Sequence, residues 1–238
     1  MKTLLVIPCY YESERLPKFL PGLCEQLAES ELPVEVLLVD DGSSKQEQKA
    51  LSHFNQKLQE KYPFLRSPLL LENNLGKGGA VRAGWDLGEG LDTLAFVDAD
   101  GAAPAEETVR FLDHVQQRSD SSQMYIATRE SGAGRKLERK LSRKIVAWVF
   151  NRLIRLCYNI QVSDTQCGLK AVPASFFEAN RDSLVQAGYA FDLELLLAAE
   201  QHGLSIETLP IDWKEIPGSS TNAKHALAFV KQILFREI

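Results

Sequence analysis

The sequence predicts a single α/β domain built on a mostly parallel, twisted sheet with helices on its faces. The first half of the chain alternates short, β-branched apolar runs with longer segments of helical period, which is typical of consecutive β-α-β units. A length of 238 residues suits one domain with a sizeable core. The 45% hydrophobic and 25% charged residues are ordinary for a globular chain.

The expected elements follow from apolar runs for strands and from apolar residues spaced near 3.6 for helices. Strands are expected at residues 4–7, 34–39, 69–71, 94–97, 124–127, 168–172 and 205–209. Helices are expected at residues 16–29, 46–61, 80–87, 106–117, 137–158, 191–202 and 224–235. The rhythm changes near Arg129 without an obvious linker, so residues 1–128 and 129–238 are expected to be two halves of one domain.

Composition and charge exclude several classes of protein. The formal net charge of -5 argues against nucleic-acid binding, which usually requires a basic domain. No stretch reaches the roughly 20 apolar residues of a membrane span, and the N-terminus lacks the pattern of a signal peptide. The four cysteines form no CxxC pair, which argues against a zinc site or a disulfide framework. We therefore expect a cytoplasmic protein.

Acidic side chains follow the expected strand at residues 94–97. In an open α/β sheet, ligands bind outside the carboxyl ends of the strands. Asp98 and Asp100 stand there one residue apart, so both carboxylates could face one divalent cation, which prefers oxygen ligands. The plain alternative is a solvated Asp-Gly turn, and for this short motif alone that alternative is favoured.

Two further strand ends strengthen the case for a ligand site. Asp40 and Asp41 follow the second expected strand, where they either turn the chain and cap a helix or point into the same crevice. Residues 76–79, which include Lys77 between glycines, open a helix. They form either a loop that faces an anion or only a flexible helix start, and their spacing fails the Walker pattern.

Positive charge gathers in the second half of the chain. The segment at 137–158 combines an apolar stripe with Arg139, Lys140, Arg143 and Lys144 elsewhere on the helix. Such a helix could lie on an anionic membrane or present arginines to a phosphate, and a core helix with a solvated basic face is an equal alternative. Cys167 has no histidine near it in sequence, so covalent cysteine catalysis is not favoured.

Taken together, the motifs resemble the family-2 glycosyltransferases of the GT-A fold. The resemblance is to the branch of dolichyl-phosphate glucosyltransferases, dolichyl-phosphate mannosyltransferases and other polyprenyl-phosphate glycosyltransferases, and it covers nearly the whole chain. The motifs that carry it are VIPCYYE at 6–12, LVDDGS at 38–43, NLGKGGAVR at 74–82, VDADGA at 97–102, ATR at 127–129, DTQCGLK at 164–170, AFDLEL at 190–195 and PIDW at 210–213. Each motif is weak alone, and the ordered set is strong.

The resemblance implies a GT-A fold, with residues 1–128 as the nucleotide-sugar donor half and 129–238 as the acceptor half. By this resemblance, six residues would bind the donor: Pro8, Tyr10, Glu12, Asp40, Lys77 and Asp98. Asp100 would bind Mg²⁺ or Mn²⁺. Asp100, Arg129 and Arg143 would make the catalytic contacts to donor or acceptor. It also implies UDP-glucose as donor and a polyprenyl phosphate as acceptor, at the inner, cytoplasmic face of a membrane on which the protein is peripheral.

An ionised lipid phosphate can attack the anomeric carbon directly and invert it, so no strong base is needed, and metal and arginines would supply electrostatic catalysis. A sugar hydroxyl acceptor, soluble or in a polysaccharide, would need a base, for which Asp164 is the candidate. A third alternative is a nucleotide-sugar binding protein without catalysis. The sequence departs from the family pattern at Tyr11, Ala102 and Ser220, and Ala102 stands where mannosyl relatives often carry a second metal ligand.

Overall fold

A computed structural model describes most of the chain. The described residues are 1–118, 120–129, 137–138, 152, 154, 157–158, 160, 162–188, 190–214 and 216. The expected C-terminal helix at 224–235 lies outside them, as do Arg143, Ser220 and most of the basic segment.

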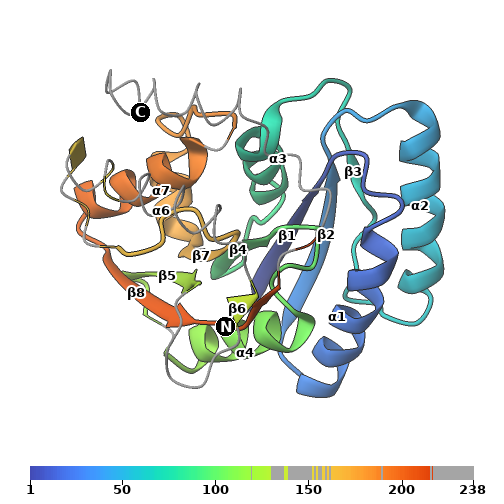
Figure 1. The fold of residues 1–238 in the computed structure, drawn as a ribbon, viewed down its shortest axis with the longest axis horizontal. Coiled ribbons are helices and arrows are strands. Elements are labelled where there is room, and N and C mark those ends of the chain that lie inside the picture. The colour runs from blue at the N-terminus through green and yellow to red at the C-terminus, as the bar shows by residue number, and fades with distance from the viewer. Residues whose placement is uncertain are drawn as a thin grey trace.

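A seven-stranded sheet in the order β3-β2-β1-β4-β7-β5-β8 forms the centre of the fold (Figure 1). Its strands are β1 (Thr3–Cys9), β2 (Val34–Asp40), β3 (Leu69–Leu70), β4 (Thr93–Val97), β5 (Gln123–Thr128), β7 (Leu169–Pro173) and β8 (Ser205–Pro210). Strand β7 runs antiparallel between β4 and β5, while the other neighbours pair in parallel. The expected mostly parallel sheet is therefore confirmed, and every expected strand is present within two residues of its expected bounds.

Helices cover both faces of the sheet, as the near-continuous apolar strands require. They are α1 (Leu16–Ser30), α2 (Lys45–Gln59), α3 (Gly76–Trp85), α4 (Ala105–Arg118), α6 (Ala174–Asn180) and α7 (Ala190–Gln201). Apolar side chains of α1, α2 and α4 pack on one face, and those of α3, α6 and α7 pack on the other. Figure 1 shows α3, α6 and α7 grouped apart from α1 and α4.

Trp85 at the end of α3 is the largest fully buried side chain of the second face. Its indole N–H donates to the Ala95 carbonyl at 3.1 Å, so the buried polar atom is satisfied. The ring contacts Phe96, Phe177 and Phe191 with centroid distances of 6.1, 5.2 and 6.0 Å. This aromatic cluster joins α3, β4, α6 and α7 in the core.

The expected elements need correction in three places. Helix α3 begins at Gly76, four residues before the expected start, because close packing there overrides the poor helix propensity of glycine. Helix α6 was not expected. The helix expected at 137–158 does not begin at 137, because β6 (Leu137–Glu138) pairs there in parallel with β9 (Trp213–Lys214). Later in the same segment, Arg152, Ile154, Cys157 and Tyr158 are helical.

Within the part of the chain that the structure describes, no helix is both long and apolar enough to cross a membrane. The division into a donor half and an acceptor half stays a prediction, because both halves contribute strands to the same sheet.

The turn after β2 yields a prediction about stability. Gly42 has φ +71°, and a Cβ on it would lie 2.4 Å from the Asn73 carbonyl carbon; Gly90 has φ +77° with open space around it. Gly90→Ala should cost about 1 kcal/mol for its left-handed backbone alone, whereas Gly42→Ala should cost at least about 2 kcal/mol because the loops must also separate. Urea unfolding of both variants measures the difference, and equal costs would contradict the close packing of the two loops.

Candidate active site

The candidate site lies where several strand ends meet. The carboxyl ends of β1, β2, β4 and β5 share one edge of the sheet because these strands are parallel. Antiparallel β7 begins at that same edge, and the Asp98 N–H donates to the Gly168 carbonyl at 2.9 Å. The loops after β1, β2, β4 and β5 and the turn before β7 therefore surround one region.

Asp98 is clamped between a lysine and a glycine. Its Oδ1 lies 2.9 Å from Lys77 Nζ, and its side chain is 34% exposed. A Cβ on Gly168 would lie only 1.8 Å from Asp98 Oδ2. A side chain at position 168 would therefore displace the Asp98 carboxylate, so Gly168 of the second half of the chain leaves the space in which this carboxylate of the first half lies.

Lys77 is held from its other side by Asp192. Its Nζ lies 3.0 Å from Asp192 Oδ2, and the other oxygen of Asp192 forms an ion pair with Lys170. Burial alone would lower the pKa of Lys77, but Asp192 and Asp98 hold it above its usual range. Sequence reasoning gave no role to Asp192 or Lys170, although a charged residue inside an apolar segment was a usable signal in both cases.

Asp100 and Glu12 bring further negative charge to the site. The Ala102 N–H donates to Asp100 Oδ1 at 3.0 Å. Burial and the charge of Asp98 raise the pKa of Asp100. Burial raises the pKa of Glu12 to about 7, with Asp100 and Asp98 acting in the same direction and the ion-paired Arg15 against them. Such repulsion is relieved when a cation binds among the carboxylates.

Glu12 offers a second observation that suits a cation. Its Oε2 is buried and has no hydrogen-bond partner among the described residues. No group of three or more His, Cys, Asp or Glu side chains that could hold a metal occurs in the described ranges. Mg²⁺ typically uses one or two carboxylates plus substrate phosphates, so Asp100 fits a metal that a donor diphosphate would complete.

At the carboxyl ends of β1 and β2, Asp40 is buried and Tyr10 is exposed. Asp40 Oδ1 accepts from the Ser43 N–H at 2.9 Å and from Gln48 Nε2 at 3.0 Å. The rings of Tyr10 and Tyr11 stand nearly perpendicular with centroids 4.8 Å apart, and both are about half exposed. Pro8 lies in β1 opposite Val39, which puts it beside the end of β2. The structure thus brings Pro8, Tyr10 and Asp40 to one corner of the edge.

The glycine segment at 76–79 is a packed helix start. The Ala187 carbonyl accepts from the Gly78 N–H at 2.5 Å, and a Cβ on Gly78 would lie 2.4 Å from the Gln186 carbonyl oxygen. The Gly78 N–H is therefore already bonded within the protein and is not available to an anion. Of the two interpretations given for this segment, the structure favours the helix start, with Lys77 as the only group of the segment that it directs to Asp98.

Arg129 and Asp164 form a buried bidentate pair. Arg129 Nε and Nη2 each lie 2.7 Å from an Asp164 oxygen, and the Arg129 N–H donates to Oδ2 at 3.0 Å. The guanidinium also lies over the Trp213 ring, 5.1 Å from its centroid. Burial alone would raise the pKa of Asp164, but Arg129 holds it below its usual range. A carboxylate bound this way is a weak base and a firm anchor for the arginine.

Cys167 is fully buried beside this pair, and burial raises the pKa of its thiol to about 12. A thiol that stays protonated at neutral pH is a poor nucleophile, so the structure, like the sequence, does not favour covalent catalysis by Cys167.

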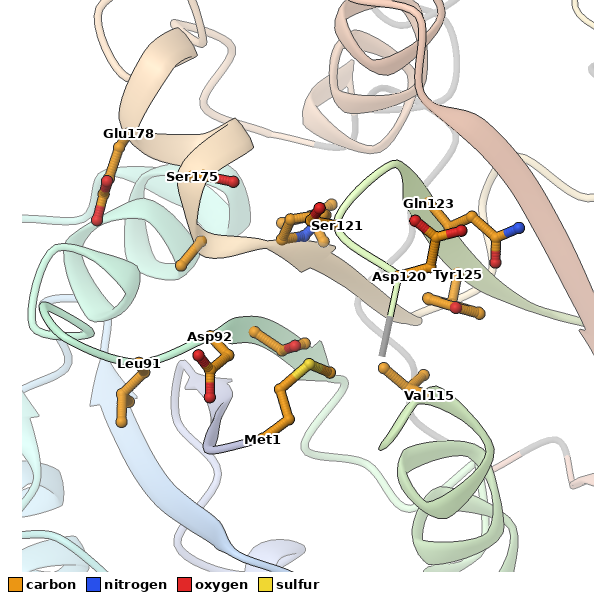
Figure 2. Close-up of a pocket in the computed structure, with 14 residues that line it drawn as sticks. Met1, Leu91, Asp92, Val115, Asp120, Ser121, Gln123, Tyr125, Ser175 and Glu178 are labelled. Atoms are coloured by element: carbon orange, nitrogen blue, oxygen red, sulfur yellow. The ribbon is translucent and has the colours of Figure 1, made fainter. Parts of the chain in front are cut away.

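A hollow of about 370 Å³ lies elsewhere, at the opposite edge of the sheet (Figure 2). Thr93 and Gln123, which begin β4 and β5, line it together with Asp92, Asp120 and Glu178. None of the expected site residues takes part in it. The described residues of the candidate site are instead gathered at the carboxyl edge.

The model of the family described as glycosyl transferase family 2 matches residues 4–180. The dolichyl-phosphate beta-glucosyltransferase of Saccharomyces cerevisiae is 30% identical over 227 residues, which is 90% of this chain and 67% of that protein. The undecaprenyl-phosphate mannosyltransferase of Micrococcus luteus is 28% identical over 218 residues, 90% of this chain and 84% of that protein.

Solved structures share the fold at lower identity. Glucosyl-3-phosphoglycerate synthase from Mycobacterium tuberculosis, in complex with Mn²⁺, UDP and phosphoglyceric acid, matches with a TM-score of 0.68 and 14% identity over 98% of this chain and 76% of that one. S. aureus TarS in complex with UDP-GlcNAc matches with a TM-score of 0.59 and 16% identity over 99% of this chain and 67% of that one.

This chain belongs to glycosyltransferase family 2. It is a glycosyltransferase of the GT-A type, and the resemblance to the polyprenyl-phosphate branch is confirmed. The expected fold is confirmed as well. The roles expected for individual residues stay predictions.

Gly168→Ala tests the clamp on Asp98. The added methyl cannot occupy a position 1.8 Å from Asp98 Oδ2, so the carboxylate must move by about an ångström or more. A misplacement of that size at a reacting centre costs about 100-fold, so kcat/KM for sugar transfer should fall by about that factor while the far-ultraviolet circular dichroism stays unchanged. Gly22→Ala, which has nothing within 4 Å of its added Cβ, serves as the control and should keep full activity.

Glu12 makes stability depend on pH. Its pKa is about 7 in the folded chain against an ordinary 4.5, so the folded state holds the proton more tightly than the unfolded state. The free energy of unfolding should therefore fall by about 3 kcal/mol from this group as pH rises from about 4.5 to above about 7. Urea unfolding of metal-free protein at several pH values, compared with Glu12→Gln, measures the effect. An identical pH slope for both proteins would contradict it.

Proposed function

We propose that this enzyme transfers glucose from UDP-glucose to a polyprenyl phosphate with inversion at the anomeric carbon. The observation that carries the proposal is the meeting of Asp98, Asp100 and Lys77 at the carboxyl edge of the sheet. Relatives that match about 90% of this chain are named as dolichyl-phosphate beta-glucosyltransferases, which supports both the sugar and the lipid phosphate.

The donor would lie across β1, β2 and β4. Tyr10 offers an exposed ring to the base, and the corner formed by Pro8, Glu12 and Asp40 would hold the nucleoside. Asp98 and Lys77 would border the diphosphate, where Lys77 supplies positive charge. Asp100 would hold Mg²⁺ or Mn²⁺, and a divalent ion there would neutralise the diphosphate as it leaves.

The reaction would be a direct displacement. An oxygen of the acceptor phosphate forms a bond to the anomeric carbon, while the bond from that carbon to the diphosphate oxygen breaks and its electron pair stays on UDP. A phosphate monoester already carries negative charge near pH 7, so no protein base is required. A β-linked product from an α-linked donor means inversion, and relatives named dolichyl-phosphate beta-glucosyltransferases support a β-linked product.

Arg129 would meet the acceptor or donor phosphate. Asp164 and the Trp213 ring fix the guanidinium, so its remaining N–H groups are held in a defined direction. Arg143 lies outside the described residues and stays a prediction for the same role. In this mechanism Asp164 acts by positioning Arg129. The role of base that the sequence suggested for Asp164 would apply only to a hydroxyl acceptor.

The proposed acceptor would require the enzyme to work at a membrane surface. A polyprenyl phosphate carries its anionic headgroup at the interface, where basic residues of a peripheral protein interact favourably with it. The protein would be peripheral at the inner, cytoplasmic face of the membrane, and the excess of Lys and Arg in the sequence at 135–144 supports attraction to anionic headgroups.

Transfer of radiolabel tests the function. We expect label from UDP-[¹⁴C]glucose to enter organic-extractable lipid phosphate in the presence of Mn²⁺, to stop with EDTA, and to exceed label from GDP-mannose at least about tenfold. Asp100→Asn should lower the rate at least about 1000-fold because it removes the proposed metal ligand. Asp113→Asn, on α4, is the matched control and should keep full activity. Label confined to a water-soluble product would overturn the lipid acceptor.

A further inference from the structure

Four charged side chains of alternating sign lead from the core of the protein to Asp98. Lys170 pairs with Asp192, Asp192 lies 3.0 Å from Lys77, and Lys77 lies 2.9 Å from Asp98. Side-chain exposure rises in the same order, through 0%, 1%, 16% and 34%. Lys170 and Asp192, the inner pair, are therefore buried, and Lys77 and Asp98, the outer pair, face the site.

Three separate elements hold this charge chain in place. Lys170 lies on β7 opposite Phe96 of β4, and its Nζ also donates to the Cys167 carbonyl at 2.7 Å. Asp192 lies in the first turn of α7, where the helix dipole stabilises an anion. Lys77 lies in the first turn of α3, and the Phe96 ring lies beneath both ammonium groups, at 4.8 and 5.5 Å from its centroid.

The stability of the fold does not explain the inner pair. Removing a lysine and an aspartate from water is costly, and an apolar pair of similar volume is usually at least as stable. The two oxygens of Asp192 are divided, one toward Lys170 and the other toward Lys77. Asp192 thus connects a fully buried cation to a cation at the site, which an apolar residue could not do.

We propose that Asp192 is a positioning residue that fixes Lys77 against Asp98, and that Lys170 offsets the charge of Asp192 so that Lys77 remains effective as a cation toward the donor diphosphate. Without Lys170, Lys77 would stand between two carboxylates and the three groups would carry a net charge of −1. With Lys170 the four groups sum to zero. The inference rests on the proposed function, in which Lys77 borders the diphosphate.

The two residues therefore have separable effects. Lys170→Met leaves Asp192 without its inner partner, so the site becomes more negative, and we expect the Kd for UDP with Mn²⁺ to rise at least about tenfold. Lys170→Met combined with Asp192→Asn removes both charges, so the Kd for UDP should return to within about threefold of wild type. In that double variant kcat should stay at least about tenfold low, because Lys77 has lost the partner that fixes its long side chain.

The double variant also guards against a failure to fold, because it leaves no unpaired charge in the core. Calorimetry gives the Kd for UDP without any turnover, and steady-state kinetics separate kcat from the KM for the donor. Val115→Ala removes buried methyl groups beside the hollow at the opposite edge of the sheet, so it should lower the melting temperature and leave kcat and Kd unchanged.

A double variant whose Kd stays weak, or whose kcat equals that of wild type, would overturn the proposal. If kcat and Kd of the variants changed only in proportion to their melting temperatures, the proposal would also be overturned in favour of a structural role, because Val115→Ala measures what a loss of stability alone does. A wrong assignment of the donor would give a different result, because the wild-type protein would then bind GDP rather than UDP. The same comparison made with GDP would still test the positioning role.

Discussion

The pairing of β7 with β4 is the constraint on which the rest of the site depends. Because β7 runs antiparallel between β4 and β5, its first residues lie at the edge where the parallel strands end. This places Gly168 against the Asp98 carboxylate and Lys170 opposite Phe96, beneath Asp98. A parallel strand in the same position would have sent both residues to the far edge.

Charge balance determines how this edge is arranged. Burial, together with repulsion from the neighbouring carboxylates, raises the pKa of Asp100 and of Glu12. Lys77 and Arg15 offset part of that repulsion inside the protein, and the proposed metal and donor would offset the remainder. Negative charge on Asp100 and Glu12 is therefore disfavoured in the free protein, and the proposed binding of a cation together with a diphosphate would relieve it.

Much of the site could be predicted because the residues that bind ligands in a parallel sheet follow the carboxyl ends of its strands. The apolar runs located β1, β2 and β4, so Pro8, Asp40, Asp98 and Asp100 followed as edge residues from periodicity alone. The start of α3 was misplaced because glycines signal flexibility in sequence, whereas Gly78 is required by close contact with the Gln186 carbonyl. The β6–β9 pair was missed because two-residue strands carry no periodic signal.

The sequence by itself determined the α/β class, the order of the strands along the chain, the acidic edge and the family, since these depend on local patterns and ordered motifs. Only the tertiary structure decided which charges meet. Lys77 and Asp192 are 115 residues apart, and Arg129 and Asp164 are 35 apart, so no local pattern links the members of either pair. The packing of α3 on α7 brings Lys77 of the first half against Asp192 of the second. Arg129 and Asp164 both belong to the second half and meet because the loop after β5 and the turn before β7 lie at the same edge of the sheet.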